Sequence, residues 1–384
     1  MFLNPAMMYA ATWFSVLLLY SFGLSDLLEP LRVSTIVLVV GTSASFILGW
    51  LLESIQFHGR LATAHFNLQA LGAVINSRRV GRRLTIIWII FILGISFEVA
   101  SFGGLPLLGL LGIGGSIQYS EFGFHGFHGV VNALFYAGCV ITFARVLLGS
   151  SRRKFILGVV SCAYPALVMS RQVLISLALQ YLLVYFSVKR PSPRIFVRAG
   201  VLFIATFLLF GYLGDLRTGR DSIISAAAPT FDYPTWLPSA FIWFYIYMCS
   251  PLNNVNYNID VTPSYFPMET AQSLVPSFAR DAFTDALGGR RQWDLVSETF
   301  NVNSLLQSFL VDFGVAGAIV FTLLCGVGFS RLLRRARTSP AAFFASIVML
   351  HGIALSFFAN LLFELVFMFE IAAISWAMAR GRRR

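Results

Sequence analysis

Arginine is the only basic residue type between residues 215 and 301, an 87-residue stretch with no lysine. Its five arginines are Arg217, Arg220, Arg280, Arg290 and Arg291. A guanidinium presents a planar fork of donors that binds phosphate or carboxylate through two hydrogen bonds, whereas an ammonium acts as a point charge. Long apolar sequence flanks the stretch on both sides. The pattern predicts an anion-binding loop between membrane spans, with these arginines as candidate binding residues.

The same stretch is rich in amide and aromatic side chains. Four asparagines, Asn253, Asn254, Asn301 and Asn303, accompany tryptophan and tyrosine residues. Amide groups hydrogen-bond sugar hydroxyls, aromatic faces stack on sugar rings, and ligand pockets commonly combine apolar walls with a few polar groups. Mixed charge on an exposed loop is equally typical of a solvated surface. A saccharide site and a plain solvated loop both remain open at this point.

A second segment, residues 103–126, is apolar yet broken by seven glycines within 103–123 and by Pro106. Such a segment cannot form a continuous span, so we expect a re-entrant or interfacial loop packed against protein. The spacing of Glu121, His125 and His128 suggests a metal site, but no helix would align the three side chains. We therefore expect no metal, and histidines that are solvated or bind substrate hydroxyls.

The elements that must position these groups are membrane helices. The chain has 384 residues, of which 57% are hydrophobic and 12% charged, and its mean hydropathy is +0.77. These values predict an all-α, polytopic integral membrane protein. About ten transmembrane helices are expected, at residues 5–23, 31–52, 84–102, 127–148, 155–170, 172–187, 199–214, 303–329, 341–359 and 361–379. Because residues 155–187 would be too long for one helix with Arg171 at its centre, a hairpin is predicted there.

The distribution of basic residues predicts the orientation. Twenty of the 28 lysines and arginines lie in every second loop and at the carboxyl end. By the positive-inside rule both termini are then cytoplasmic, and the 215–301 loop faces outward. The apolar stretch 236–252 is read as an interfacial helix, since a crossing there would break the alternation. The net charge of +11 is therefore a topology signal and no indication of nucleic-acid binding.

Several ionisable residues fall within or beside these segments, toward the outer side: Glu98, Arg171, Asp312 and Glu364. Such residues are costly in lipid and usually face a cavity or a partner. The alternative is a set of structural ion pairs, for instance Arg171 with Glu98. Three of the four cysteines lie in spans and the fourth in an apolar stretch, so no disulfide framework is predicted.

Short motifs give the chain a resemblance to a known family. They are Gly103-Gly104-x-Pro106, Ser170-Arg171-Gln172, the run 250–254, and the run 299–304 followed by Asp312-Phe-Gly314-x-x-Gly317. Over roughly residues 95–330 the chain resembles the bacterial O-antigen polymerases, the Wzy-type oligosaccharide repeat-unit polymerases of lipopolysaccharide biosynthesis. The resemblance implies a GT-C-like glycosyltransferase of the inner membrane. It would act on undecaprenyl-pyrophosphate-linked saccharides at the periplasmic face, together with a chain-length regulator.

The residues agree with that chemistry. An outward site has no nucleotide sugars, so fixed guanidiniums, including Arg171, would bind the pyrophosphate leaving group, and neither metal nor cofactor is expected. A carboxylate or histidine should accept the proton of the attacking hydroxyl, and Asp221, Glu298 and His125 are the expected catalytic residues in that order. The asparagines would orient sugars. Two alternatives remain, an O-antigen ligase and a lipid-linked saccharide flippase.

Overall fold

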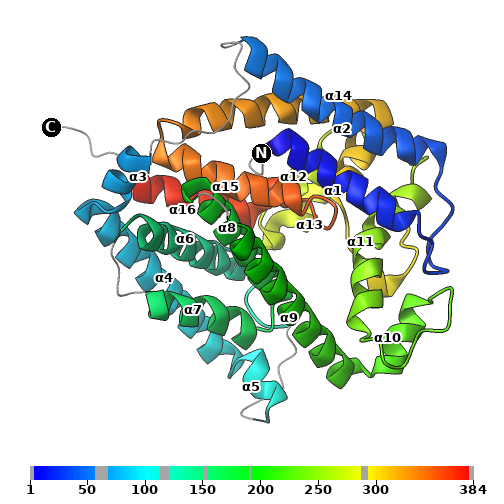
Figure 1. The fold of residues 1–384 in the computed structure, drawn as a ribbon, viewed down its shortest axis with the longest axis horizontal. Coiled ribbons are helices and arrows are strands. Elements are labelled where there is room, and N and C mark those ends of the chain that lie inside the picture. Colours follow the sequence, from blue (N-terminus) through cyan, green and yellow to red (C-terminus); the bar gives the residue numbers. More distant parts are fainter. Residues whose placement is uncertain are drawn as a thin grey trace.

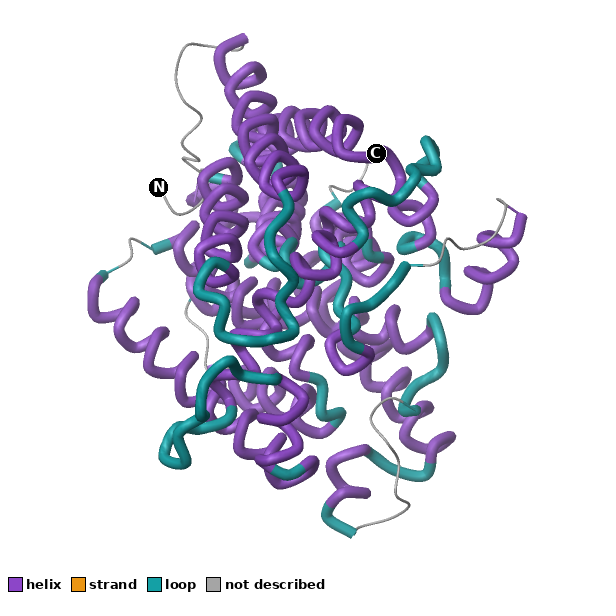
Figure 2. The backbone as a smooth tube through the Cα atoms, turned by 90° about the vertical axis from the view of Figure 1, so that its right-hand side faces the viewer, coloured by secondary structure: helices purple, strands orange, loops and turns teal. Residues whose placement is uncertain are grey.

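A computed structural model describes residues 4–56, 68–112, 121–149, 154–189, 192–286 and 293–379. Every regular element in these ranges is a helix, and loops join the helices (Figure 2). In chain order they are α1 (Pro5–Tyr20), α2 (Val33–Gln56), α3 (Leu68–Ile75), α4 (Arg78–Phe102), α5 (Pro106–Leu110), α6 (Phe127–Leu148), α7 (Lys154–Leu167), α8 (Arg171–Val188), α9 (Pro193–Thr218), α10 (Arg220–Ala227), α11 (Ala240–Tyr257), α12 (Met268–Gln272), α13 (Ser277–Ala286), the 3₁₀ helix η1 (Glu298–Phe300), α14 (Leu305–Ala336), α15 (Pro340–Ala354), the 3₁₀ helix η2 (Leu361–Phe363) and α16 (Leu365–Met378).

Each apolar segment predicted from the sequence contains a helix, which confirms the all-α fold. Helices long and apolar enough to cross a membrane are found at Val33–Ile55, Arg78–Gly109, Phe127–Leu148, Arg171–Val188 and Leu305–Ala336. Shorter apolar helices are α1, α15 and α16. Large aliphatic side chains stay exposed along these helices, as at Val33 and Ile55 of α2 and Leu93 of α4. Such faces are what a helix in lipid presents.

The predicted hairpin at Arg171 is confirmed, because α7 ends at Leu167 and α8 begins at Arg171. Met169 adopts a left-handed conformation (φ 54°), which reverses the chain. The Ser170 hydroxyl then accepts the N–H of Val173 at 3.4 Å and caps α8.

Two predicted boundaries need correction. The outward loop was expected to start at Asp215, but α9 continues to Thr218. The helix expected over 236–252 runs instead from Ala240 to Tyr257, and most of its residues are buried against α1, α9, α10 and α14. Apolar composition marked this helix, but its burial arises from contacts with segments far away in the chain.

Glycines allow α2 and α14 to pack at very short range (Figure 1). A Cβ on Gly49 would overlap the carbonyl oxygen of Leu323, and one on Gly326 would overlap that of Phe46. Small residues at such crossings are typical of helix packing in membranes, where dispersion contacts rather than burial from water hold helices together. Gly314, at φ 69°, interrupts α14 at a point nearer its amino-terminal end than this crossing.

Ion pairs and capping contacts gather the basic helix ends on one side. Buried Glu53, near the end of α2, bridges Arg331 (3.1 Å) and Arg334 (2.9 Å) of α14. Arg83, near the start of α4, donates to carbonyls at the end of α16, including that of Trp376 at 2.6 Å. A cation at a helix carboxyl end is favoured by the exposed carbonyl dipoles. Figure 1 shows α3 and α16 on this side, at the left.

The long region after α9 gathers with other helix ends on the opposite side, where Figure 1 shows α10 and α11. The N–H of Asp26, after α1, donates to the carbonyl of Ala228, after α10, at 2.8 Å. The N–H of Leu365, at the start of α16, donates to the carbonyl of Ser273, after α12, at 3.0 Å. Backbone hydrogen bonds therefore join the end of α1 to that of α10, and the end of α12 to the start of α16. The orientation of the chain in a membrane stays a prediction.

Candidate functional site

A cavity of about 120 Å³ opens between the start of α6, the start of α16 and the connection from α12 to α13. Three polar residues line it, Arg280, Glu364 and Ser273, and the rest of its wall is apolar. The other lining residues are Gly126, Gly129, Val130, Val275, Leu365, Val366 and Phe369. A concave, mostly apolar wall with a few convergent polar groups is the usual form of a ligand site. This cavity is the candidate functional site.

Arg280, in the first turn of α13, is the cationic group of the cavity. Its Nη2 donates a long hydrogen bond of 3.4 Å to the carbonyl of Val275, which draws the side chain toward the α12–α13 connection. Its Nε is buried and has no hydrogen-bond partner among the described residues. A buried donor without an acceptor costs about 1–3 kcal/mol. An anion in the cavity would remove that cost, so Arg280 is suited to bind one.

Glu364 is the acidic group of the cavity and is half-buried at the amino-terminal end of α16. Burial raises the pKa of its carboxyl to about 7, and the positive charge of Arg280 partly opposes that shift. A carboxylate with a pKa near neutrality is well matched to accept a proton at neutral pH. The sequence left open whether Glu364 faces a cavity or a partner, and the structure places it on the wall of a cavity that Arg280 also lines.

Asp312 fixes the position of α12, the short helix that precedes Ser273 of the cavity wall. Its buried carboxylate accepts the N–H groups of Glu269 (2.7 Å) and Thr270 (2.9 Å) at the start of α12. The first N–H groups of a helix lack partners within it, so this carboxylate from α14 caps α12. Asp312 is therefore paired inside the protein, as expected for an ionisable residue in a membrane segment, and it positions the site indirectly.

No protein-family model, curated protein or solved structure matches this chain. Its function has to be inferred from its own residues and their arrangement.

Of the other predicted arginines, Arg171 and Arg220 have described side chains, and neither lines the cavity. Arg220 donates through Nη2 to the carbonyls of Pro234 (2.9 Å) and Leu237 (3.2 Å), and its guanidinium lies 5.8 Å from the ring centre of Tyr233. These contacts close the turn between α10 and α11. Arg217 lies in the last turn of α9 with its side chain outside the described part of the structure. Arg290 and Arg291 also lie outside the described residues.

Asn253 and Asn254 use their amides inside the protein. The Asn253 Oδ1 accepts the hydroxyl of Tyr20 at 2.6 Å and the N–H of Glu29 at 2.9 Å, and its Nδ2 donates to the carbonyl of Leu27 at 2.7 Å. The Asn254 Nδ2 donates to the carbonyls of Phe300 and Val302, and its Oδ1 accepts the N–H of Val296. Both side chains are buried, so they fasten two distant segments to α11, and neither lines the cavity.

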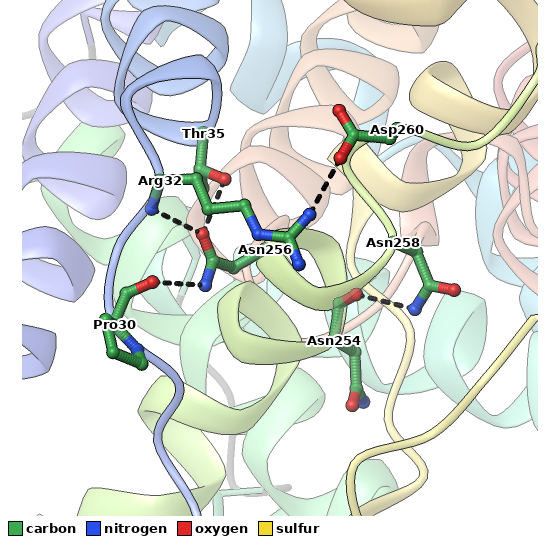
Figure 3. Close-up of polar contacts among 7 residues, drawn as sticks. All are labelled: Pro30, Arg32, Thr35, Asn254, Asn256, Asn258 and Asp260. Carbon is green, nitrogen blue, oxygen red and sulfur yellow. Dashed lines mark hydrogen bonds and ion pairs between the residues drawn. The ribbon is translucent and has the colours of Figure 1, made fainter.

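Two further asparagines extend this arrangement along α11 (Figure 3). The Asn256 Oδ1 accepts the N–H of Arg32 (2.9 Å) and the hydroxyl of Thr35 (2.7 Å), while its Nδ2 donates to the carbonyl of Pro30 (3.0 Å). Asn258 donates to the carbonyl of Asn254 at 2.9 Å. The asparagine run of the sequence is thus a set of backbone clamps.

The histidine segment is organised by Glu98. The buried Glu98 carboxylate lies 2.9 Å from the His128 Nδ1 and accepts the N–H of Phe124 at 3.2 Å. A Cβ on Gly123, at φ 97°, would press against the His128 ring, so glycine is required there. His125 is exposed and precedes α6. Among the described residues, no three His, Cys, Asp or Glu side chains gather as a metal site.

The remaining predicted residues are dispersed. Asp221 is exposed in the first turn of α10, and Arg171 is exposed at the start of α8. Asn301 and Asn303 are exposed between η1 and α14. Glu298 begins η1, with its side chain outside the described part. The roles of these residues stay predictions. Sequence reasoning did not predict that Arg280 and Glu364 line one cavity.

Proposed function

We propose that this protein is a metal-independent glycosyltransferase that polymerises oligosaccharide repeat units carried on undecaprenyl pyrophosphate. Ten helices would span the inner membrane in a GT-C-like arrangement, with both termini in the cytoplasm and the cavity at the periplasmic face. The observation that supports the proposal is a cavity beside two apolar helices that both Arg280 and Glu364 line. The reaction is inferred from the resemblance of short sequence motifs to those of O-antigen polymerases.

In the proposed reaction, a hydroxyl of the incoming lipid-linked repeat unit attacks the anomeric carbon of the growing chain. A new glycosidic C–O bond forms, and the bond from the anomeric carbon to the pyrophosphate oxygen breaks. That oxygen leaves with the bonding electron pair, so the carrier departs as a pyrophosphate anion. Arg280 stabilises the developing negative charge, and the ionised Glu364 accepts the proton of the hydroxyl.

Glu364 takes the role that the sequence assigned first to Asp221, because Glu364 faces a cavity with a cation whereas Asp221 is exposed. The other arginines of the 215–301 region remain candidates for further phosphate contacts. Asn301 and Asn303 remain candidates for sugar binding because their side chains are exposed.

A complemented deletion strain tests the proposal. We expect deletion to leave lipid A core carrying a single repeat unit, because ligation continues while polymerisation stops. Glu364→Gln should fail to restore polymer at normal protein level, while Asp221→Asn should restore it. Polymer that accumulates on the carrier lipid, with no repeat units on lipid A, would identify a ligase instead. Loss of all external repeat units would indicate a flippase.

A further inference from the structure

A buried polar contact joins α8 to α16, within the group of helices that α6, α8, α15 and α16 form (Figure 1). Gln180 lies near the middle of α8, which is long and apolar enough to cross a membrane, and Glu370 lies in the second turn of α16. Neither side chain is exposed. The Gln180 Nε2 donates to the Glu370 Oε2 at 3.0 Å. One oxygen of each side chain remains to be accounted for.

These remaining oxygens, Glu370 Oε1 and Gln180 Oε1, have no hydrogen-bond partner among the described residues, and both are shielded from water. An ionised carboxylate and an amide carbonyl are both acceptors, so neither oxygen can satisfy the other. The Ser176 hydroxyl, one turn from Gln180 on α8, does not hydrogen-bond either oxygen. A donor smaller than a water molecule is therefore needed between the two side chains.

Arginine and lysine side chains do not balance the Glu370 carboxyl. In the described part of the chain the acidic residues that form ion pairs are Glu53, Glu98 and Asp260. Glu370 is the single charged residue of α16, and the arginines of α4, α6 and α8 lie in the first or last two turns of those helices. A buried carboxylate without a cation is costly in the interior of a membrane protein.

Titratable side chains on the neighbouring helices offer no counter-charge either. Among the described residues the buried ones on helices that pack against α16 are Glu98 of α4, Tyr136 and Cys139 of α6, and His351 of α15. Of these types, only histidine can become positive. The His351 ring lies against Phe367, with 4.7 Å between ring centres, and neither of its nitrogens has a partner in the described structure. A positive imidazolium would leave two buried N–H groups unpaired, so His351 does not serve as the cation.

We infer that Glu370 binds a proton on Oε1 and donates it to Gln180 Oε1, so that the two side chains form a closed, neutral acid–amide pair inside the helix group. The proton supplies the missing donor and removes the buried charge in one step. The Glu370 O–H and the Gln180 N–H then donate in opposite directions across one ring of hydrogen bonds. This proton site goes beyond the proposed function and does not depend on it.

The bound proton makes the helix that carries one cavity wall sensitive to pH. Glu364, Leu365, Val366 and Phe369 line the cavity, and Glu370 is the next residue of α16. A glutamate in the unfolded chain is ionised at neutral pH, so the folded protein holds one more proton than the unfolded chain. Stability then falls as pH rises, because the folded state must give up that proton or retain it at growing cost. The α8–α16 contact should weaken as Glu370 ionises.

Infrared spectroscopy of the full chain in lipid nanodiscs observes the proton directly. A protonated carboxyl has its own carbonyl stretching band, separate from those of carboxylates, and the band shifts in D₂O. We expect the difference spectrum between wild type and Glu370→Gln at neutral pH to contain this band. Asp281→Asn is the matched control, since Asp281 is exposed on α13, and its difference spectrum should contain carboxylate bands alone. Carboxylate bands alone for Glu370→Gln would overturn the proposal.

Substitutions of the pair test its hydrogen bonds through the melting temperature. Gln180→Leu and Glu370→Leu each leave one buried polar side chain without its partner, so each should lower the melting temperature. The double variant leaves neither and should be more stable than either single variant. Glu370→Gln keeps a donor and an acceptor at position 370 and should stay close to wild type. A double variant no more stable than the single variants would overturn the pairing.

The response of the melting temperature to pH and to sodium separates a proton from a metal cation. Wild type should lose stability relative to Glu370→Gln as pH rises, and exchanging Na⁺ for choline at constant ionic strength should change neither protein. Stabilisation of wild type by Na⁺ that Glu370→Gln lacks would assign the site to a metal ion and overturn the proton. An identical pH response of the two proteins would also overturn it. These readouts need no polymer formation, so a protein without polymerase activity would refute the proposed function and leave the proton site standing.

Discussion

At the scale of single residues, the raised pKa of Glu364 predicts a pH dependence of polymerisation. Burial raises the pKa of Glu364 to about 7, and a general base must be ionised to act. The rate of polymerisation should therefore rise as pH increases through about 7 and level off above it. The measurement is polymer formation by the purified protein from a lipid-linked repeat unit. A rate that falls across this range would exclude Glu364 as the base.

Arg280 variants sharpen this prediction. Because the Arg280 charge lowers the pKa of Glu364, Arg280→Met should move the midpoint of the pH profile to higher pH. Arg280→Lys keeps the charge and should keep the midpoint. Both should slow the reaction, with a loss of about 10²–10³ for Arg280→Met, typical of removing one fixed donor at a developing charge. An ammonium cannot reproduce the two-pronged contact with phosphate, so Arg280→Lys should not restore the full rate.

The asparagines divide into clamps and candidate ligands, and substitution separates the two groups. Asn256→Leu removes three hydrogen bonds to residues 30–35, and each buried group left unpaired costs about 1–3 kcal/mol. We expect a lower melting temperature and reduced abundance. Asn301→Leu and Asn303→Leu should leave stability unchanged, because both side chains are exposed, and should impair polymer formation. A stable Asn256→Leu protein without activity would contradict the clamp role.

At the scale of elements, the crossing of α2 and α14 depends on glycine. Gly326→Ala places a Cβ against the carbonyl oxygen of Phe46, whereas Gly328→Ala, two residues along the same helix, meets open space. Overpacking of this kind costs about 1–3 kcal/mol. Gly326→Ala should lower the melting temperature in detergent, and Gly328→Ala should not. Equal stability of the two variants would show that the helices separate there without cost.

Hydrogen bonds between neighbouring elements hold the walls of the cavity in position, although the residues that make them take no part in the proposed reaction. Asp312 caps α12, the first residue of α16 bonds the end of α12, and Glu98 fixes the segment before α6. The walls of the cavity are thus fastened by three separate contacts. Their partners lie 30 to 92 residues apart in the chain, so the site forms only once the helices have assembled.

At the scale of the whole molecule, the alternation of basic helix ends predicts a membrane topology. On a background without the four cysteines, a single cysteine at position 225 or 285 should react with an impermeant reagent added outside the cell. Cysteines at positions 80, 152, 194 and 336 should react only after the membrane is opened. Labelling from outside at position 152 but not at 285 would reverse the orientation.

The sequence by itself determined the long apolar helices, because length and apolar composition are local properties. Apolar length predicts these helices, Arg171 predicts the break in the hairpin, and the alternation of basic loops predicts the topology. The loop arginines and asparagines were also visible, but their individual roles were not. Only the tertiary structure separated the clamps Asn253 and Asn254 from the cavity residue Arg280. That Arg280 and Glu364 line one cavity lies beyond any local pattern, since it depends on how distant helices assemble. Its chemistry then depends on burial, which no residue type or spacing specifies.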